Sequence, residues 1–298
     1  MSTERGQRFL KELPELNQDL PCAPKIIAQL FTQTVPWSTD SNEDIATTVA
    51  RDQGLTARVL TLANSAHYGL KDSITTIPRA VSLMGLDEVR SMVLMVAALG
   101  VASSLKGRDD FELAPYWRHQ VLTGIAAEAL AKEIMANAAE LGIDEQLDPS
   151  ECYTTGILHD LGKAITAIHR PESWQSIVHL AQSRGLSHSD AEIRYWGMDH
   201  GVIGGMALVA WNLPATITEP ISRHHAPNSS TPSHRLGAQL LHTADALALL
   251  TDNPEALIPG PWPEFLDTWK IDQEQFLADL AIRAEEPRAT SLIAQLDN

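Results

Sequence analysis

The chain is organised around residues 156–163, whose sequence is Gly156-Ile157-Leu158-His159-Asp160-Leu161-Gly162-Lys163. Apolar residues recur at helical spacing from position 157 to position 168 and predict the start of a buried helix. Asp160 falls on this apolar stripe, with His159 beside it. An ionised carboxylate there is costly unless a partner compensates its charge, and either a metal cation or an ion pair with His159 would do so. Lys163, one turn further on, could reach an anion bound at the same place.

Composition describes an ordinary globular protein with a bias towards helices. The chain has 298 residues, enough for one large domain or two modest ones. Its residues are 44% apolar, 20% charged and only 5% aromatic, and its apolar runs are rich in Leu, Ala, Ile and Val. The formal net charge of −16 argues against nucleic-acid binding, which needs a basic surface. This charge suits protein partners, or an anionic ligand that a cation helps to bind.

The sequence predicts a cytoplasmic protein that does not insert into a membrane. Met1 is followed by the polar and charged residues Ser2 to Arg5 and by no apolar segment, so we expect no secretory signal. The longest apolar run, Met92 to Ala102, is too short to cross a bilayer. Cys22 and Cys152 are the two cysteines, and such sparse usage is typical of a reducing compartment without disulfides.

The pattern along the chain predicts an all-α fold, because short helical segments follow one another without strand alternation. The polar stretch Ser103 to Asp110 is the expected boundary. It separates an N-terminal helical subdomain (1–110) from a second helical subdomain (111–252), and a C-terminal helical extension (253–298) follows. In the second subdomain, helices are expected near 115–135, 156–169, 174–184, 190–195, 199–211, 216–225 and 235–250, with an acidic loop at 140–151.

Seven ionisable side chains occur where the helical pattern predicts apolar residues. They are His119, His159, Asp160, His200, His224, His225 and Asp245. A single core histidine is most simply one that a backbone carbonyl satisfies. Seven inward-facing groups, however, need mutual compensation. The remaining histidines fall mostly in polar or loop settings, and they are His67, His169, His179, His188, His234 and His242.

These ligand types predict a site for two divalent transition-metal ions. Imidazole and carboxylate together suit Fe, Mn, Zn or Ni, and seven ligands serve two ions better than one. Asp160 is the expected bridge between the ions and, with Lys163, a candidate catalytic residue. Lys163 would neutralise a phosphate oxygen, or it is a surface lysine whose stem lies along the protein. Gly201, Gly204 and Gly205 follow His200 and are expected to permit close helix packing, because no strand precedes them as a nucleotide loop requires.

The order of these residues resembles the HD superfamily of metal-dependent phosphohydrolases. In that family, the positions of His119, His159-Asp160 and Asp245 supply the metal site. His200 and the pair His224-His225 resemble the binuclear branch, which includes the HD-GYP cyclic-di-GMP phosphodiesterases. Here Ala226-Pro227 follows the histidine pair and no Gly-Tyr-Pro motif is present, which argues against cyclic-di-GMP hydrolysis.

A longer pattern, over residues 19–250, resembles the HDOD domain. Its motifs are Leu20-Pro21 with Pro24, Arg51-Asp52, Ala63 to Gly69, Leu83 to Leu86, Tyr116 to His119, Trp211 to Pro214 and His242 to Asp245. The resemblance implies an HD-type helical bundle preceded by an N-terminal helical subdomain. It also implies a bacterial signalling output module, usually without demonstrated catalysis.

Two functions remain open. The favoured one is a regulatory module with an HD-type metal site that binds a signalling protein or a nucleotide. The alternative is a binuclear metal-dependent phosphohydrolase that acts on a nucleotide or another phosphoester. A third possibility is that the inward polar set is a relic that binds nothing. For the enzyme, His119, His159, Asp160 and Asp245 would hold one ion, and His200, His224 and His225, with Asp160 as the bridge, would hold the other.

Overall fold

The computed structural model describes residues 105–290 with small gaps at 106, 211–212, 257, 259 and 287–288. Before this part it describes residues 6–12, 40–50 and 75–85, together with a few isolated residues. Every element in these described ranges is a helix, which confirms the predicted all-α fold. Several predicted motif positions, among them Leu20 to Pro24 and Ser65 to Gly69, lie outside the described residues.

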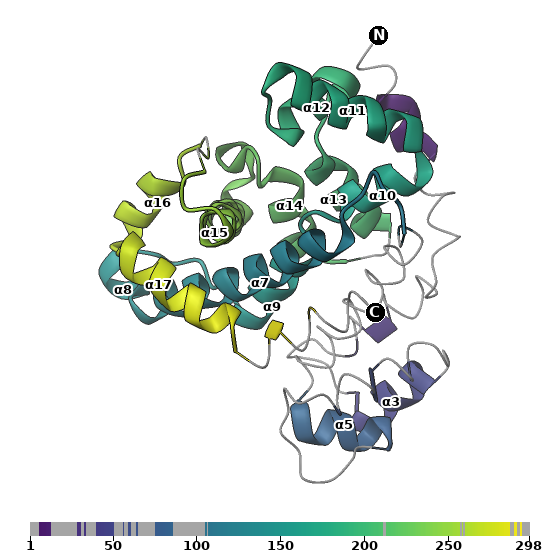
Figure 1. The fold of residues 1–298 in the computed structure, drawn as a ribbon. Coiled ribbons are helices and arrows are strands. Elements are labelled where there is room, and N and C mark those ends of the chain that lie inside the picture. The colour runs from purple at the N-terminus through teal and green to yellow at the C-terminus, as the bar shows by residue number, and fades with distance from the viewer. Residues whose placement is uncertain are drawn as a thin grey trace.

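Figure 1 shows how the helices are arranged. The N-terminal part contributes α3 (Asn42–Ala50) and α5 (Ile77–Met84), which pack on each other. The helices that follow are α7 (Leu113–Ala136), α8 (Ala138–Leu141), α9 (Pro149–Leu158), α10 (Leu161–His169), α11 (Pro171–Arg184), α12 (His188–Trp196), α13 (His200–Ala210), α14 (Ala215–Arg223), α15 (Arg235–Asp252), α16 (Trp262–Trp269) and α17 (Gln273–Ala284). Short 3₁₀ turns at Pro227–Ser229 and Pro232–His234 join α14 to α15.

Three helices, α7, α9 and α15, form the centre of the bundle. Helix α7 is buried on several sides, as expected for a helix whose apolar residues are not confined to one stripe. It meets α9 at a crossing of two glycines, where a Cβ on Gly156 would lie 2.6 Å from the Cα of Gly124. Helices α16 and α17 pack on α15, and their buried side chains join the same apolar core. The three-part division of the chain stays a prediction.

A second glycine crossing brings α10, α13 and α14 together. A Cβ on Gly162 would overlap the carbonyl oxygen of His200, and one on Gly204 would lie 3.0 Å from the backbone nitrogen of Gly162. A Cβ on Gly205 would overlap the hydroxyl of Ser222 on α14. The glycines after His200 are therefore packing residues, as predicted, and they hold the first turn of α13 against the first turn of α10.

The predicted helix over 156–169 is wrong, because the chain forms two helices there. Helix α9 begins earlier, at Pro149, where the Asp148 side chain accepts a hydrogen bond of 2.8 Å from the Ser150 backbone. It ends at Leu158, and Asp160 has φ −95° and ψ 10° in the turn before α10. The predicted acidic loop at 140–151 is correspondingly shorter, since α8 and α9 occupy its two ends.

Two further sequence predictions can be compared with the described residues. Cys152 is buried and free of any disulfide, while Cys22 lies outside the described part. No described helix combines the length and the apolar character that a membrane span requires.

Candidate metal centre

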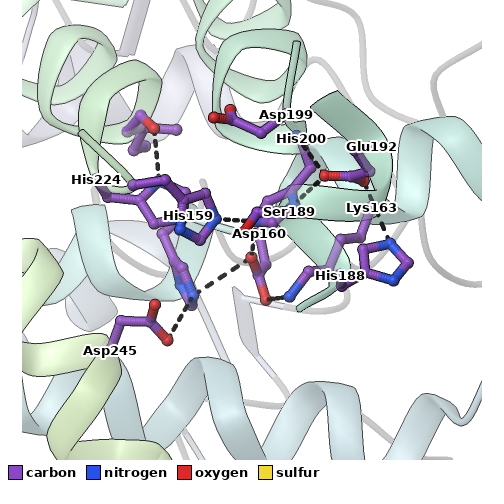
Figure 2. A network of polar contacts seen from close by, with 12 residues as sticks. His159, Asp160, Lys163, His188, Ser189, Glu192, Asp199, His200, His224 and Asp245 are labelled. Atoms are coloured by element: carbon purple, nitrogen blue, oxygen red, sulfur yellow. Dashed lines mark hydrogen bonds and ion pairs between the residues drawn. The ribbon is translucent and has the colours of Figure 1, made fainter. Parts of the chain in front are cut away.

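The seven predicted residues come from five places in the fold and lie close together. Figure 2 shows five of them, which are His159, Asp160, His200, His224 and Asp245. His119 lies on α7 and Asp245 on α15, while the other five lie at helix ends. Their possible ligand atoms form three overlapping groups whose members all lie within 4.8 Å of one another. These groups are His119, His159 and Asp160; His159, His224 and Asp245; and His200, His224 and His225.

Two of the imidazoles are oriented by the ends of their own helices. The Nδ1–H of His159 donates to the carbonyl oxygen of Gly156 at 2.7 Å, and that of His224 donates to Ile221, also at 2.7 Å. Because a carbonyl oxygen only accepts, Nδ1 carries the proton in both rings and Nε2 keeps a lone pair. Neither buried Nε2 has a hydrogen-bond partner among the described residues. Metal-binding histidines are held in this way, with one nitrogen on a carbonyl and the other free for the ion.

The carboxylates of Asp160 and Asp245 are ionised and lie close to the histidines. Asp160 Oδ2 is 2.6 Å from the Lys163 ammonium, and Asp245 Oδ1 is 3.0 Å from His119 Nε2. Burial alone would raise both carboxyl pKa values. For Asp160, the fields of His159 and Lys163 overcome burial and hold the pKa well below its usual range. The pKa of Asp245 is lowered too, since its contact with His119 outweighs the effect of burial.

His200 links Asp160 to a residue that the sequence reasoning missed. Its Nε2 lies 2.8 Å from Asp160 Oδ1, and its Nδ1 lies 2.6 Å from Glu192 Oε2. The same Glu192 oxygen accepts from the backbone nitrogen of His200 at 2.8 Å, which caps the start of α13. Burial opposes protonation of His200, yet the two carboxylates raise its pKa to about 10.

Glu192 is fully buried on α12, and its Oε1 lies 3.2 Å from Nε2 of His188. Burial would raise its carboxyl pKa, but the two flanking histidines lower it to about 2. The sequence did carry a signal for it, because Glu192 sits beside Ala191 and one turn before Trp196, both of which are core residues. His188, which is 23% exposed, forms the outer end of this contact.

His225 and His242 complete the surroundings of the site. Nε2 of His225 lies 2.9 Å from Nε2 of His200, and burial lowers the pKa of His225 well below its usual value. A neutral imidazole is the form that binds a metal ion. His242 is one of the remaining histidines, which are expected to fall mostly in polar or loop settings. This residue is buried on α15, and its Nδ1–H donates to the backbone oxygen of His224 at 2.7 Å.

A cavity of about 470 Å³ opens the site to small molecules. His119, Asp160 and Lys163 form its inner end. The remaining lining comes from the segment before α7, from the first turn of α7, and from α11, and consists of Asp109, Asp110, Phe111, Glu112, Pro115, Tyr116, Trp174, Val178 and Gln182. Lys163 is 24% exposed and His119 15% exposed, whereas His159 and His224 have no exposed surface. A ligand would therefore reach the site past Lys163.

The residues present fit a transition-metal site. Five imidazoles and two ionised carboxylates converge, and two buried imidazole nitrogens lack partners that an ion would supply. The group His200, His224 and His225 coincides with the set predicted for one ion. The group that joins His159, His224 and Asp245 overlaps both predicted sets, so His224 lies within reach of either position.

Comparison with known proteins places these features in a family context. A curated protein of Treponema pallidum without an assigned function is 26% identical over 182 residues, which are 61% of this chain and 33% of that protein. The chain thus spans about a third of the length of this relative.

Two solved structures share the fold. One is a protein of Shewanella amazonensis with the provisional name phosphohydrolase, at 25% identity and a TM-score of 0.70, covering 95% of this chain and 97% of that one. The other is a protein of Marinobacter aquaeolei provisionally named for signal transduction, at 19% identity and a TM-score of 0.76, covering 100% and 67%. The family model described as the HDOD domain matches residues 20–227, well over half of the sequence. The chain therefore belongs to the HDOD domain family.

Proposed function

We propose that this chain is a signalling module of the bacterial cytoplasm whose HD-type site binds two divalent transition-metal ions and a phosphorylated small molecule. The observation that carries the proposal is the orientation of His159 and His224. Each donates Nδ1–H to a carbonyl oxygen and leaves a buried, unpaired Nε2 beside ionised carboxylates. A buried polar atom without a partner is rare in a folded protein, and a metal ion would satisfy both nitrogens.

The seven converging residues would hold the ions. His119, His159, Asp160 and Asp245 would bind one, and His200, His224 and His225 the other, with Asp160 shared between them. When bound, the two ions would act as Lewis acids on a phosphoryl oxygen and orient the phosphate group. Lys163 projects at the inner end of the cavity and would neutralise a further phosphate oxygen.

The signalling role is supported by the family and by the charge of the chain. Iron, manganese, nickel and zinc all suit the ligand set. A net charge of −16 favours a protein partner over nucleic acid or an anionic membrane. In this proposal, a signalling protein partner binds differently depending on whether metal and ligand occupy the site.

Metal content of the untagged protein, purified under low oxygen, tests the proposal. Elemental mass spectrometry should find close to two equivalents of a transition metal. His224→Ala should lose at least one equivalent, whereas His179→Ala, which removes an exposed histidine of α11, should lose none. Absence of metal, even after reconstitution with iron or manganese, would contradict the proposal.

A phosphohydrolase activity is the second candidate, and the cavity that ends at Asp160 and Lys163 favours it. Here the ligand would be a substrate, and Asp160 would be required both for metal binding and for turnover. Manganese-loaded protein should hydrolyse a chromogenic phosphoester such as p-nitrophenyl phosphate, and Asp160→Ala should abolish this reaction. Loss of partner signalling in that variant, with no measurable turnover in the parent protein, would favour the regulatory module.

A further inference from the structure

The cavity that leads to the metal centre has two ends of different chemistry. Its inner end holds Lys163 and His119 beside the buried Asp160. Lys163 is the sole lysine or arginine among the described residues that line the cavity. With metal ions in place, the positive charge of the cavity would be concentrated at this end, which is where a phosphate would bind.

The outer part of the cavity is acidic. Asp109, Asp110 and Glu112 line it, and Asp109 and Glu112 are exposed to solvent. The charge of Asp110 is already engaged, because Arg108 contacts its two carboxylate oxygens at 2.8 and 2.7 Å. Asp109 and Glu112 are therefore the residues that set the sign of the potential at the mouth.

Three aromatic residues that pack on one another, Phe111, Tyr116 and Trp174, also line the cavity and form its aromatic wall. The ring of Phe111 lies 5.2 Å from the ring of Tyr116 and 5.2 Å from that of Trp174, measured between centroids. The indole nitrogen of Trp174 donates to the carbonyl oxygen of Asp110 at 2.7 Å, which ties the wall to the acidic segment. Aromatic faces beside carboxylates attract organic cations.

We propose that the cavity selects a small zwitterionic phosphoester, with one phosphate at Lys163 and the metal centre and a cationic group at the mouth. The inference rests on the proposed function, because bound metal supplies most of the attraction for the phosphate. A ligand with several phosphates would place negative charge beside Asp109 and Glu112. The cavity therefore disfavours nucleoside triphosphates and cyclic dinucleotides by charge, independently of their size.

Two probes of similar size test the charge preference directly. Phosphoethanolamine and ethyl phosphate differ chiefly by one ammonium group, and calorimetry on manganese-loaded protein gives the affinity of each. We expect phosphoethanolamine to bind about tenfold more tightly, because each exposed carboxylate contributes up to about fivefold to an ion pair. The preference should fall to about twofold or less in the double variant Asp109→Asn, Glu112→Gln.

A matched control removes two exposed acids that do not line the cavity. The double variant Glu172→Gln, Asp190→Asn changes the net charge by the same amount and should keep the full preference. Three results from protein that has bound manganese would overturn the inference and leave the metal proposal standing. They are equal binding of both probes, tighter binding of ethyl phosphate, and no binding of either probe. Protein that binds no manganese overturns the proposed function, and this inference falls with it.

Discussion

Gly162 lies in close contact with backbone atoms beside the candidate metal centre, and replacing it tests how the site is assembled. In Gly162→Ala, the new Cβ would overlap the carbonyl oxygen of His200 and would lie 2.8 Å from its carbonyl carbon and 2.9 Å from the nitrogen of Gly204. All three are backbone atoms, so no side-chain rotation relieves the clash. Helix α13 must move away from α10.

The size of the effect follows from two opposed contributions. Overpacking of this kind costs about 1–3 kcal/mol, and contact with backbone atoms places this site at the upper end. Alanine gains at most about 1 kcal/mol of helix propensity over glycine. The net loss is about 2 kcal/mol, which lowers the melting temperature of a protein of this size by about 3 °C. The same shift draws His200 Nε2 away from Asp160 Oδ1, now 2.8 Å apart, so affinity for the ion bound by His200 should fall as well.

Thermal unfolding followed by circular dichroism measures the first effect, and metal content measures the second. Gly237→Ala is the matched control, since its Cβ would meet only the Pro220 side chain, at 3.2 Å, and its melting temperature should stay within about 1 °C of the parent. A Gly162→Ala protein as stable as the parent and with full metal content would show that the α10–α13 crossing does not position His200.

Three further predictions concern single side chains. Glu192→Gln should weaken Co²⁺ binding about 10- to 100-fold in spectroscopic titrations, because Glu192 orients His200 and makes it a stronger ligand. Asp148→Ala should destabilise the protein by about 1 kcal/mol in thermal unfolding, since it removes the side-chain cap of α9. The contact with Arg108 lowers the pKa of Asp110 to about 2 despite its partial burial. The stability that ionised Asp110 contributes is therefore present above about pH 4, near the carboxyl pKa of about 4 in the unfolded chain, and is lost as the pH falls towards 2. Over that pH range, the urea midpoint of unfolding should drop more in the parent than in Asp110→Asn.

The changes at Glu192 and Asp148 each have a control that removes a similar group from an exposed position, and the third prediction compares Asp110→Asn with the parent. Asp190→Asn lies on the same helix as Glu192 and should leave Co²⁺ affinity unchanged. Asp144→Ala removes an exposed carboxylate from the loop before α9 and should shift stability by less than about 0.5 kcal/mol. Unchanged Co²⁺ affinity in Glu192→Gln would contradict the role given to the Glu192–His200 contact. Unchanged stability in Asp148→Ala would contradict the cap of α9. An equal loss of stability at low pH in the parent and in Asp110→Asn would contradict the role given to the Arg108–Asp110 contact.

The sequence allowed the residues that converge at the candidate metal centre to be predicted, because an ionisable residue on an apolar helical stripe stands out. His119, for example, lies on the face of α7 that carries Leu122 and Ala126, both of which are fully buried. Periodicity could not predict the break at His159, since the apolar pattern continues from Ile157 through Ile168 across two helices. It also left Glu192 without a role, because that residue acts by contacting a histidine on another helix.

The helix break at His159 and the role of Glu192 were both missed for one physical reason. The candidate site is built largely from the ends of helices. The last carbonyl groups and first amide groups of a helix need partners from outside the helix. His159 and His224 supply such partners through Nδ1–H, and Glu192 accepts from the first amide of α13. The side chains that cap the C-terminal ends of α9 and α14 and the N-terminal end of α13 therefore also fix which nitrogen of each imidazole ring faces the candidate metal centre. The same contacts cap the helices and orient the ligands. A substitution that frays one of these helix ends should therefore lower metal affinity even when every ligand residue is kept.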